Sequence, residues 1–335
     1  SGGYTGSSSG VTNTEEWSFP PITASILNEG DMWFNSSTSA LKVYGSAPGI
    51  PSTTWSSGGA LNTARGMAAG GGTQTAAIIF GGVGGPAVTG VTETYDGTSF
   101  TEVNDLNTAR AYLGGANASP QTAAMGFGGG SPYKANTEKW NGTSWTEVND
   151  MNTARDFVAG SGTQSSALGA GGYVAPTVSA LVESWNGTSW TETTNINTAR
   201  SQASNVGTGT ASLLFGGDKY PASPREANET ESWDGSAWTE LNNLNTARRV
   251  VFNSGFGRQS QAILPGGGTP PATANVEAWN GTSWAEINNL STATKGGTGT
   301  GSGVAGMYSG GDTGSYTTNN EEFTSPAAVT TVTTS

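Results

Sequence analysis

The residues that could do chemistry in this chain are few, because histidine and cysteine are both absent. Their absence removes the commonest general base, the most reactive nucleophile and the commonest ligands of zinc. Paired carboxylates for glycoside hydrolysis remain compatible with the composition, but no acidic residue stands apart from the repeat together with a second acid that could form such a pair. Asp105, Asp150 and Asp218 could bind Ca²⁺ with backbone oxygens, although no EF-hand-like spacing supports this. We therefore predict no catalytic residue, metal ligand or cofactor, and expect a protein that is not an enzyme.

Five of the eight arginines end copies of one motif, Asn-Thr-Ala-Arg, and a degraded copy, Ser-Thr-Ala-Thr, occupies 291–294. Repetition at equivalent places indicates an architectural role. We expect each arginine to pair with the glutamate of a Glu-x-aromatic motif in the same or an adjacent repeat, since that glutamate would be costly to bury alone. The alternative is a functional ring of arginines around a central channel. The arginines are Arg65, Arg110, Arg155, Arg200 and Arg248.

Candidate ligand contacts lie in segments that differ between repeats. Tyr133 and Lys134 belong to one such segment, and Lys219, Tyr220 and Arg225 belong to a longer one. Loops that vary on a repeated scaffold are where specificity is usually carried. The alternative is that these loops are merely tolerated variation.

The element that must position these residues is a hairpin, seen most clearly between Trp140 and Trp145. The intervening Asn141-Gly142 predicts a two-residue type I′ turn, which needs positive φ at both central positions. Both tryptophans then project to one face of the hairpin. Because a lone hairpin is marginal in water, this face must be covered by a neighbouring sheet.

Copies of this hairpin recur along the chain. Glu-x-aromatic occurs seven times, from Glu15/Trp17 to Glu321/Phe323, and a Gly-Gly pair precedes each copy. From Tyr95 onward the first aromatics are 45, 45, 48, 46 and 44 residues apart, whereas a second aromatic occurs six times. A period in the mid-forties built from short strands and Gly-rich turns is typical of propeller blades. We expect tryptophans to pack between blades, among them Trp140, Trp185, Trp233 and Trp279.

The repeat resembles the kelch repeat of β-propellers. The resemblance rests on Gly-Gly, an aromatic followed by Asp or Asn (Tyr95-Asp96, Trp140-Asn141, Trp233-Asp234), a Trp about five residues on, then a hydrophobic residue and an Arg. It covers the chain outside 18–54 and the tail, and implies an all-β propeller of four-stranded blades. The histidine and cysteine that hold copper in galactose-oxidase-like kelch enzymes do not exist here.

The motif counts predict one propeller domain over 1–335 with seven blades, the alternative being six blades with a displaced first repeat. Residues 18–54 interrupt the first blade, and 327–335 either close the ring with a strand or form an extended tail. The chain opens without Met at Ser1-Gly2-Gly3 in mid-repeat, so we expect an upstream segment.

The interruption at 18–54 contains two strand-like runs around a Ser/Thr turn. This resembles a small hairpin module of phage tail-fibre and related virion proteins. Trp33, Phe34 and Tyr44 make it the most aromatic insertion in the chain, which suggests a docking role. The alternative is an elongated hairpin that covers its own blade.

The net charge of −12, from 13 basic and 25 acidic residues, makes a nucleic-acid partner unlikely on electrostatic grounds. The sequence contains neither an apolar run long enough to span a membrane nor a signal peptide. We expect a non-enzymatic structural or adhesion protein of a phage virion, present in many copies and binding other virion proteins or a host-surface glycan. A secreted bacterial carbohydrate-binding or carbohydrate-active propeller, which would be extracellular, and a kelch interaction scaffold are the alternatives.

Overall fold

The structure is a computed structural model. It describes residues 53–130, 132–268 and 271–325, and the backbone alone of 32–35, 40–45 and 328–331. The chain forms two compact units instead of the single domain expected from the repeat. Unit 1 comprises 1–46 and 327–335, and unit 2 comprises 47–326.

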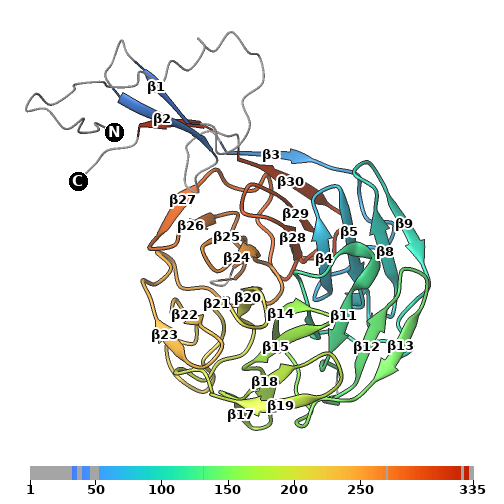
Figure 1. Ribbon diagram of the computed structural model, residues 1–335. Helices are drawn as coiled ribbons and strands as arrows, with labels where there is room; N and C mark the ends of the chain where they lie inside the picture. The colour runs from blue at the N-terminus through green and yellow to red at the C-terminus, as the bar shows by residue number, and fades with distance from the viewer. Residues whose placement is uncertain are drawn as a thin grey trace, which may run out of the picture. The chain divides into compact units, whose positions relative to one another are not determined.

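Unit 2 is a β-propeller in which the described residues form six four-stranded antiparallel blades around an axis (Figure 1). We number the blades in chain order from β4, and each begins with its innermost strand. Blade 1 is β4 (Ala69–Thr73), β5 (Ala76–Phe80), β8 (Thr92–Tyr95) and β9 (Phe100–Val103); blade 2 is β10 (Gly114–Gly115), β11 (Met125–Phe127), β12 (Thr137–Trp140) and β13 (Trp145–Val148); blade 3 is β14 (Ala159–Thr163), β15 (Ser166–Ala170), β18 (Val182–Trp185) and β19 (Trp190–Thr193).

The remaining blades follow the same order, except that the last takes its outer strand from the start of the unit. Blade 4 is β20 (Ser204–Gly207), β21 (Ser212–Phe215), β22 (Thr230–Trp233) and β23 (Trp238–Glu240); blade 5 is β24 (Phe256–Arg258), β25 (Gln261–Pro265), β26 (Val276–Trp279) and β27 (Trp284–Ile287); blade 6 is β28 (Thr298–Gly301), β29 (Ala305–Ser309), β30 (Asn320–Thr324) and β3 (Thr54–Ser57). Short hairpins β6 (Val83–Gly84) with β7 (Ala87–Val88) and β16 (Tyr173–Val174) with β17 (Thr177–Val178), and a 3₁₀ turn at Gln121–Ala123, complete the unit.

The closure of the ring shows that the prediction of seven blades was wrong and that its alternative, six, holds. Trp55 of β3 lies opposite Phe323 of β30, so Trp55 is the second aromatic of the last blade. The six second aromatics therefore count the blades, whereas the copy at Glu15/Trp17 lies outside the described residues. By pairing with β30, the strand from the other end of the unit covers an edge that would otherwise be unpaired and completes the last blade.

Unit 1 contains a three-stranded sheet of β1 (Met32–Asn35), β2 (Ala40–Gly45) and β31 (Ala328–Thr331). The pairing of β31 with β2 corrects the expectation for 327–335, because this strand neither closes the ring nor extends as a tail. The predicted hairpin at 18–54 is present as β1 and β2. Trp33 and Phe34 lie on β1 and Tyr44 lies on β2, with side chains outside the described part, so docking remains a prediction.

The tryptophan hairpin differs from the expected two-residue turn. Trp140 and Trp145 lie directly opposite each other, so the loop has four residues. The side-chain oxygen of Asn141 accepts hydrogen bonds of 2.9 Å from the backbone N–H of both Thr143 and Ser144. Of the Asn-Gly pair, Gly142 alone has a positive φ, at 93°. The asparagine is therefore used for its acceptor, and the same turn is made with Asp at 96 and 234.

The core lies between blades, as the aromatic repeat predicts. Among the described residues, six hydrophobic clusters each join one blade to the next; the cluster of blades 2 and 3, for example, contains Phe127, Trp185 and Trp190. Phe127 and Trp190 have ring centroids 4.7 Å apart, and the Trp190 indole N–H donates to Thr137 Oγ1 at 2.9 Å. The tryptophans expected to be buried are 1–2 % exposed: Trp140, Trp185, Trp233 and Trp279.

The repeated arginines form buried ion pairs, so they do not form a ring of free guanidiniums around the axis. In blade 3, Arg155 Nη2 lies 3.0 Å from Glu183 Oε1, and both side chains are fully buried. The other oxygen of Glu183 accepts from the backbone N–H of Asn152 at 2.7 Å, which ties the turn to the third strand. Equivalent pairs join Arg65 to Glu93, Arg110 to Glu138, Arg200 to Glu231 and Arg248 to Glu277.

Candidate functional site

Strand direction gives the ring two faces. The Asn-Thr-Ala-Arg turns and the variable loops after Gly-Gly share one face, which we call the loop face. The turns between the first two strands of each blade, and the tryptophan hairpin turns, share the opposite turn face. The five candidate ligand residues all belong to loops of the loop face.

Six residues at equivalent positions surround the axis at the loop face, and we call them the mouth ring. Each lies two residues after the last residue of the Asn-Thr-Ala-Arg motif, and each has a left-handed backbone with φ between 51° and 63°. This conformation costs an ordinary residue roughly 1–2 kcal/mol, yet five of the six are not glycine. The members are Met67, Tyr112, Phe157, Gln202, Val250 and Gly296.

Backbone hydrogen bonds link the mouth ring from blade to blade. Tyr112 N–H donates to the carbonyl of Met67 at 3.1 Å, Phe157 N–H donates to that of Tyr112 at 2.8 Å, and Met67 N–H donates to that of Gly296 at 2.8 Å. The last of these joins blade 1 to blade 6. Because Gly296 makes such bonds without a side chain, the bulky residues of the other blades are not needed for the backbone geometry.

The side chains of the mouth ring close the loop-face end of the channel. Phe252 packs with Met67, Tyr112, Phe157 and Val250 in one apolar cluster. The centroids of the Tyr112 and Phe157 rings are 4.4 Å apart, and Phe157 and Phe252 meet edge to face at 5.5 Å. The two mouth-ring residues without an apolar side chain, Gln202 and Gly296, are outside this cluster.

A segment of blade 5 crosses the axis beneath this cluster. Asn253 donates from Nδ2 to the carbonyls of Ala68 in blade 1, at 3.1 Å, and Leu113 before the first strand of blade 2, at 2.9 Å. Nearer the turn face, Asn117 of blade 2 donates to the carbonyl of Asn205 in blade 4 at 2.7 Å. The chain itself thus fills the middle of the channel and leaves a separate hollow at each end.

The loop-face hollow, of about 250 Å³, lies between blades 3 and 4. Its walls come from the mouth ring and from two variable loops. The lining residues are Phe157, Tyr173, Ser201, Gln202, Asp218, Tyr220 and Arg225. Tyr133 packs edge to face against Tyr173, with ring centroids 5.9 Å apart, and extends the aromatic wall beyond the lining residues.

One wall of this hollow is a fixed ionic and aromatic group. Asp218 is fully buried and pairs with Arg225 through both carboxylate oxygens, one of them 3.0 Å from Arg225 Nε. The Arg225 guanidinium lies 5.0 Å from the centroid of the Tyr220 ring. The Arg225 side chain is still 42 % exposed and the Tyr220 residue 41 % exposed, so both can meet a ligand without breaking these contacts.

Two buried acceptors near the hollow have no partner among the described residues. Gln202 lines the hollow, whereas Asp156 does not line it and only adjoins its lining residues Phe157 and Tyr173. Asp156 Oδ1 and Gln202 Oε1 receive no hydrogen bond. Asp156 is only 7 % exposed and its backbone pairs with that of Tyr173. Burial raises the pKa of Asp156 to about 7. A buried acceptor without a donor loses hydration free energy, so a ligand that supplies hydroxyl or amide donors would be stabilised here.

The structure brings together part of the predicted set. Tyr220 and Arg225 line the hollow, and Tyr133 contacts its aromatic wall. Lys219 instead pairs with Glu229 at 2.6 Å, and Lys134 is half-buried and forms no part of the lining.

Asp156, Phe157 and Gln202 are not among the residues predicted from the sequence. A signal was present, because Asp156 follows a repeat arginine at a position that holds Gly66, Ala111, Ser201, Arg249 and Lys295 in the other blades. An acid at that position is therefore specific to blade 3. The φ values that mark the mouth ring have no sequence signal, since its members share no residue type.

Within the described ranges, no three acidic side chains gather in a way that could hold a metal ion. None of the helical segments among the described residues has both the length and the apolar character of a membrane span.

Comparisons with known proteins place the fold but not the function. No protein-family model matches the chain, and no curated protein matches it. Among solved structures, the structure of YjhT matches with a TM-score of 0.64 and 13 % sequence identity, over 82 % of this chain and 99 % of that chain. At this identity the likeness shows the β-propeller fold alone.

Proposed function

We propose that this chain is a non-enzymatic adhesion protein of a phage virion that binds a host-surface glycan in the loop-face hollow. The observation that carries the glycan assignment is the composition of that hollow, which combines aromatic rings with an unpaired acceptor, Gln202 Oε1, and a fixed Arg–Asp pair. Ligand sites of this kind use flat apolar surface for affinity and a few placed polar groups for orientation. A sugar offers an apolar ring face for Tyr173 or Tyr220 and a hydroxyl donor for Gln202.

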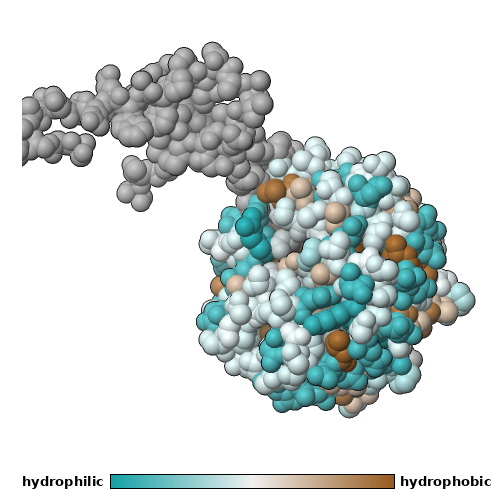
Figure 2. Space-filling view, turned by 45° about the vertical axis from the view of Figure 1, so that its right-hand side comes forward, coloured by the Kyte–Doolittle hydropathy of each residue, from teal (hydrophilic) through white to brown (hydrophobic). Residues whose placement is uncertain are grey.

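The side of the ring that Figure 2 shows is mostly polar. On the side of the ring seen in Figure 2, hydrophobic residues form small separate areas and no continuous patch. Large exposed apolar patches are typical of surfaces that dock another protein. A sugar needs only one exposed ring beside polar groups, and Tyr220 supplies this at the rim of the hollow.

The virion assignment rests on resemblance. Residues 18–54 resemble a hairpin module of phage tail-fibre proteins, and the low-charge repeats, rich in Gly, Thr and Asn, are of a type seen in phage proteins. In this proposal unit 1 docks the chain to another virion protein through Trp33, Phe34 and Tyr44. The propeller presents its loop face to the host.

The test is binding of the full chain to an array of bacterial surface glycans, followed by titration of the best ligand. We expect Tyr220→Ala and Arg225→Gln to weaken binding at least about tenfold, the loss of one good contact of about 1.4 kcal/mol. Arg258→Gln, on the turn face, is the matched control and should change affinity less than about twofold. Equal affinity of the wild type and both loop-face variants would exclude this hollow as the glycan site.

A carbohydrate-active enzyme is the second candidate, and Asp156 is the observation that favours it. A carboxyl group with a pKa of about 7 is suited to general acid–base catalysis at neutral pH. Incubation of the bound glycan with wild type and Asp156→Asn separates the two functions. A binding protein leaves the glycan intact with either variant, whereas an enzyme forms product that Asp156→Asn abolishes.

A further inference from the structure

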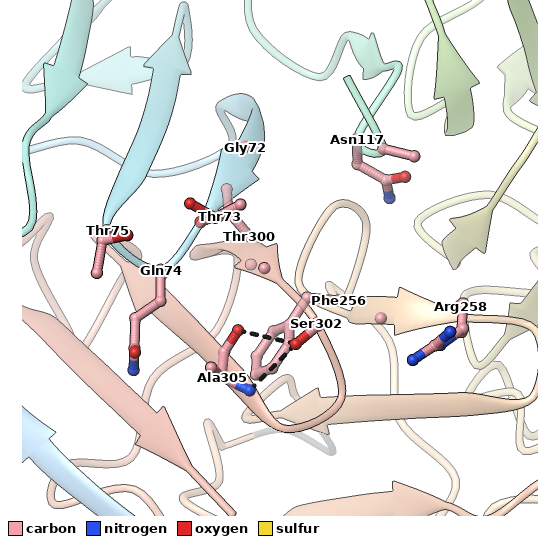
Figure 3. A pocket seen from close by; sticks show the side chains of 14 residues that line it. Gly72, Thr73, Gln74, Thr75, Asn117, Phe256, Arg258, Thr300, Ser302 and Ala305 are labelled. Atoms are coloured by element: carbon pink, nitrogen blue, oxygen red, sulfur yellow. Dashed lines mark hydrogen bonds between the residues drawn. The ribbon is translucent and has the colours of Figure 1, made fainter. Parts of the chain in front are cut away.

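The second hollow lies at the turn-face end of the channel and is the larger, at about 520 Å³. It is lined by the ends of innermost strands from blades 1, 5 and 6 and by the inserted segment of blade 2. In Figure 3, Arg258 extends from β24 toward this space, and Asn117 approaches it from another element. Its size falls within the range of small-molecule sites.

Arg258 is the one charged residue among those that line this hollow, and no acid lines it. The chain as a whole carries 25 acidic residues and a net charge of −12, so an acid-free hollow around a cation is unusual for this protein. Each of the other seven arginines has a carboxylate partner. Among the described residues, the Arg258 guanidinium has no ion pair and no hydrogen bond.

A second observation points to a ligand. Thr300 is 1 % exposed and lines the hollow, yet its hydroxyl has no hydrogen-bond partner in the described part of the chain. Hydroxyl and amide groups of Thr73, Gln74, Asn117 and Ser302 surround the same space. A buried hydroxyl without a partner loses hydration free energy, and a polar ligand would recover it.

We propose that the turn-face hollow binds a small hydroxylated carboxylate, with the carboxylate on Arg258 and the hydroxyl groups on the surrounding side chains. A guanidinium matches a carboxylate with two parallel hydrogen bonds. One cation balances one negative charge, whereas a phosphate dianion would leave a charge uncompensated. The glycines at the strand ends leave the hollow open, because they present no side chains to it.

The test is an NMR titration of the full chain with D-glucuronate, D-glucose and inorganic sulfate. Glucose is the neutral match of glucuronate, and sulfate tests for a general anion site. We expect glucuronate to shift the signals of residues around the hollow with saturation, and glucose to leave them unchanged. Arg258→Gln should weaken glucuronate binding at least about tenfold. The site is exposed to solvent ions, so the affinity should also fall with added salt.

Lys295→Gln removes a charge at the loop face outside both hollows and is the matched control, and it should change glucuronate affinity less than about twofold. This design separates the two hollows, because the glycan test depends on Arg225 and this one on Arg258. Unchanged affinity in Arg258→Gln, or equal binding of glucose and glucuronate, would overturn the proposal. Sulfate binding as tight as that of glucuronate would overturn the carboxylate assignment and leave a general anion site.

Discussion

The two ends of the channel both use backbone with positive φ, but they use it with different residues. At the turn face, five innermost strands have a glycine at or next to their last residue, with φ between 96° and 117°. At the loop face, the mouth ring has φ between 51° and 63° and carries Met, Tyr, Phe, Gln and Val in five of six blades. The glycines are Gly72, Gly162, Gly207, Gly257 and Gly301.

The difference follows from backbone sterics. A φ near 57° lies in the left-handed helical region that L residues can enter at a cost, whereas a φ near 100° lies outside it. At the turn face an added Cβ would also collide with a carbonyl oxygen, 2.3 Å away in the case of Gly162 and Ser166. The turn-face end is therefore restricted to glycine and stays open, and the loop-face end can bear side chains that close the mouth.

The strained end is anchored by ion pairs. In blade 3, Phe157 follows Arg155 by two residues, so the buried Arg155–Glu183 pair fixes the chain immediately before the left-handed position. Blade 6 has Thr294 in place of arginine, and its mouth-ring residue is Gly296, which needs no such anchoring. The anchored blades are thus the ones that carry a strained side chain.

The largest expected effect comes from breaking an anchor. Arg155→Met leaves Glu183 buried without its cation, and loss of one partner of a buried pair costs about 3–5 kcal/mol. Urea unfolding measures this loss. The double variant Arg155→Met, Glu183→Gln should recover part of it, because no uncompensated charge remains and the amide oxygen can still accept from the Asn152 N–H. A double variant no more stable than the single one would show that the arginine acts by packing instead.

A second variant tests the restriction to glycine at the turn face. Gly162→Ala should cost about 3 kcal/mol or more, since it adds a collision to an unfavourable φ. Gly85→Ala is the control, because Gly85 has a φ of 62° and no atom within 4 Å of an added Cβ. It should cost only about 1 kcal/mol. Similar losses in the two variants would mean that the collision contributes little.

Much of this architecture could be predicted from the sequence because each blade repeats the same residues. The hairpins, the buried tryptophans and the Arg–Glu pairs follow from residue type and spacing. The blade count failed because Trp55 looks like every other second aromatic, and nothing local shows that it pairs with Phe323. Strand pairing between distant ends is set by the closure of the ring and not by the motif.

The channel and its two ends could be predicted less well. The spacing from Arg248 to Gln259 is two residues longer than that from Arg155 to Gln164, and this extra length is what lets Asn253 cross the axis. Blade 2 has the same extra length and supplies Asn117. These insertions were visible in the sequence, but where they lead depends on the opposite blade, which the sequence does not indicate.

A third variant tests the buried acid of the loop-face end by pH. The pKa of Asp156 is about 7 in the fold and about 3.9 in the unfolded chain. At a pH below both pKa values the carboxyl group is neutral in the folded and in the unfolded state. As the pH rises from about 4 to 7, the group ionises more readily in the unfolded chain, and this lowers the stability of the fold. The difference between the two pKa values corresponds to about 4 kcal/mol at pH 8, so Asp156→Asn should stabilise the protein by up to that amount there and by little at pH 4. A pH-independent difference would mean that Asp156 is not held neutral by burial.

The smallest expected effect is also the sharpest test of the strained mouth ring. At most buried positions an alanine variant is more stable than a glycine variant, because glycine loses more backbone entropy on folding. Val250 has a φ of 58°, so that order should reverse there. Val250→Ala loses apolar burial and keeps the strain, which costs about 1 kcal/mol. Val250→Gly loses the same burial but relieves roughly 1–2 kcal/mol of left-handed strain.

The glycine variant should therefore be within about 1 kcal/mol of the wild type and more stable than the alanine variant. Thermal unfolding of the three proteins measures this order. Ala68→Gly is the control, because Ala68 is buried next to Met67 of the mouth ring and has no left-handed backbone. This glycine variant should be less stable than the wild-type alanine. If Val250→Gly is less stable than Val250→Ala, the backbone at position 250 is not strained. The side chain at this position would then need no functional explanation.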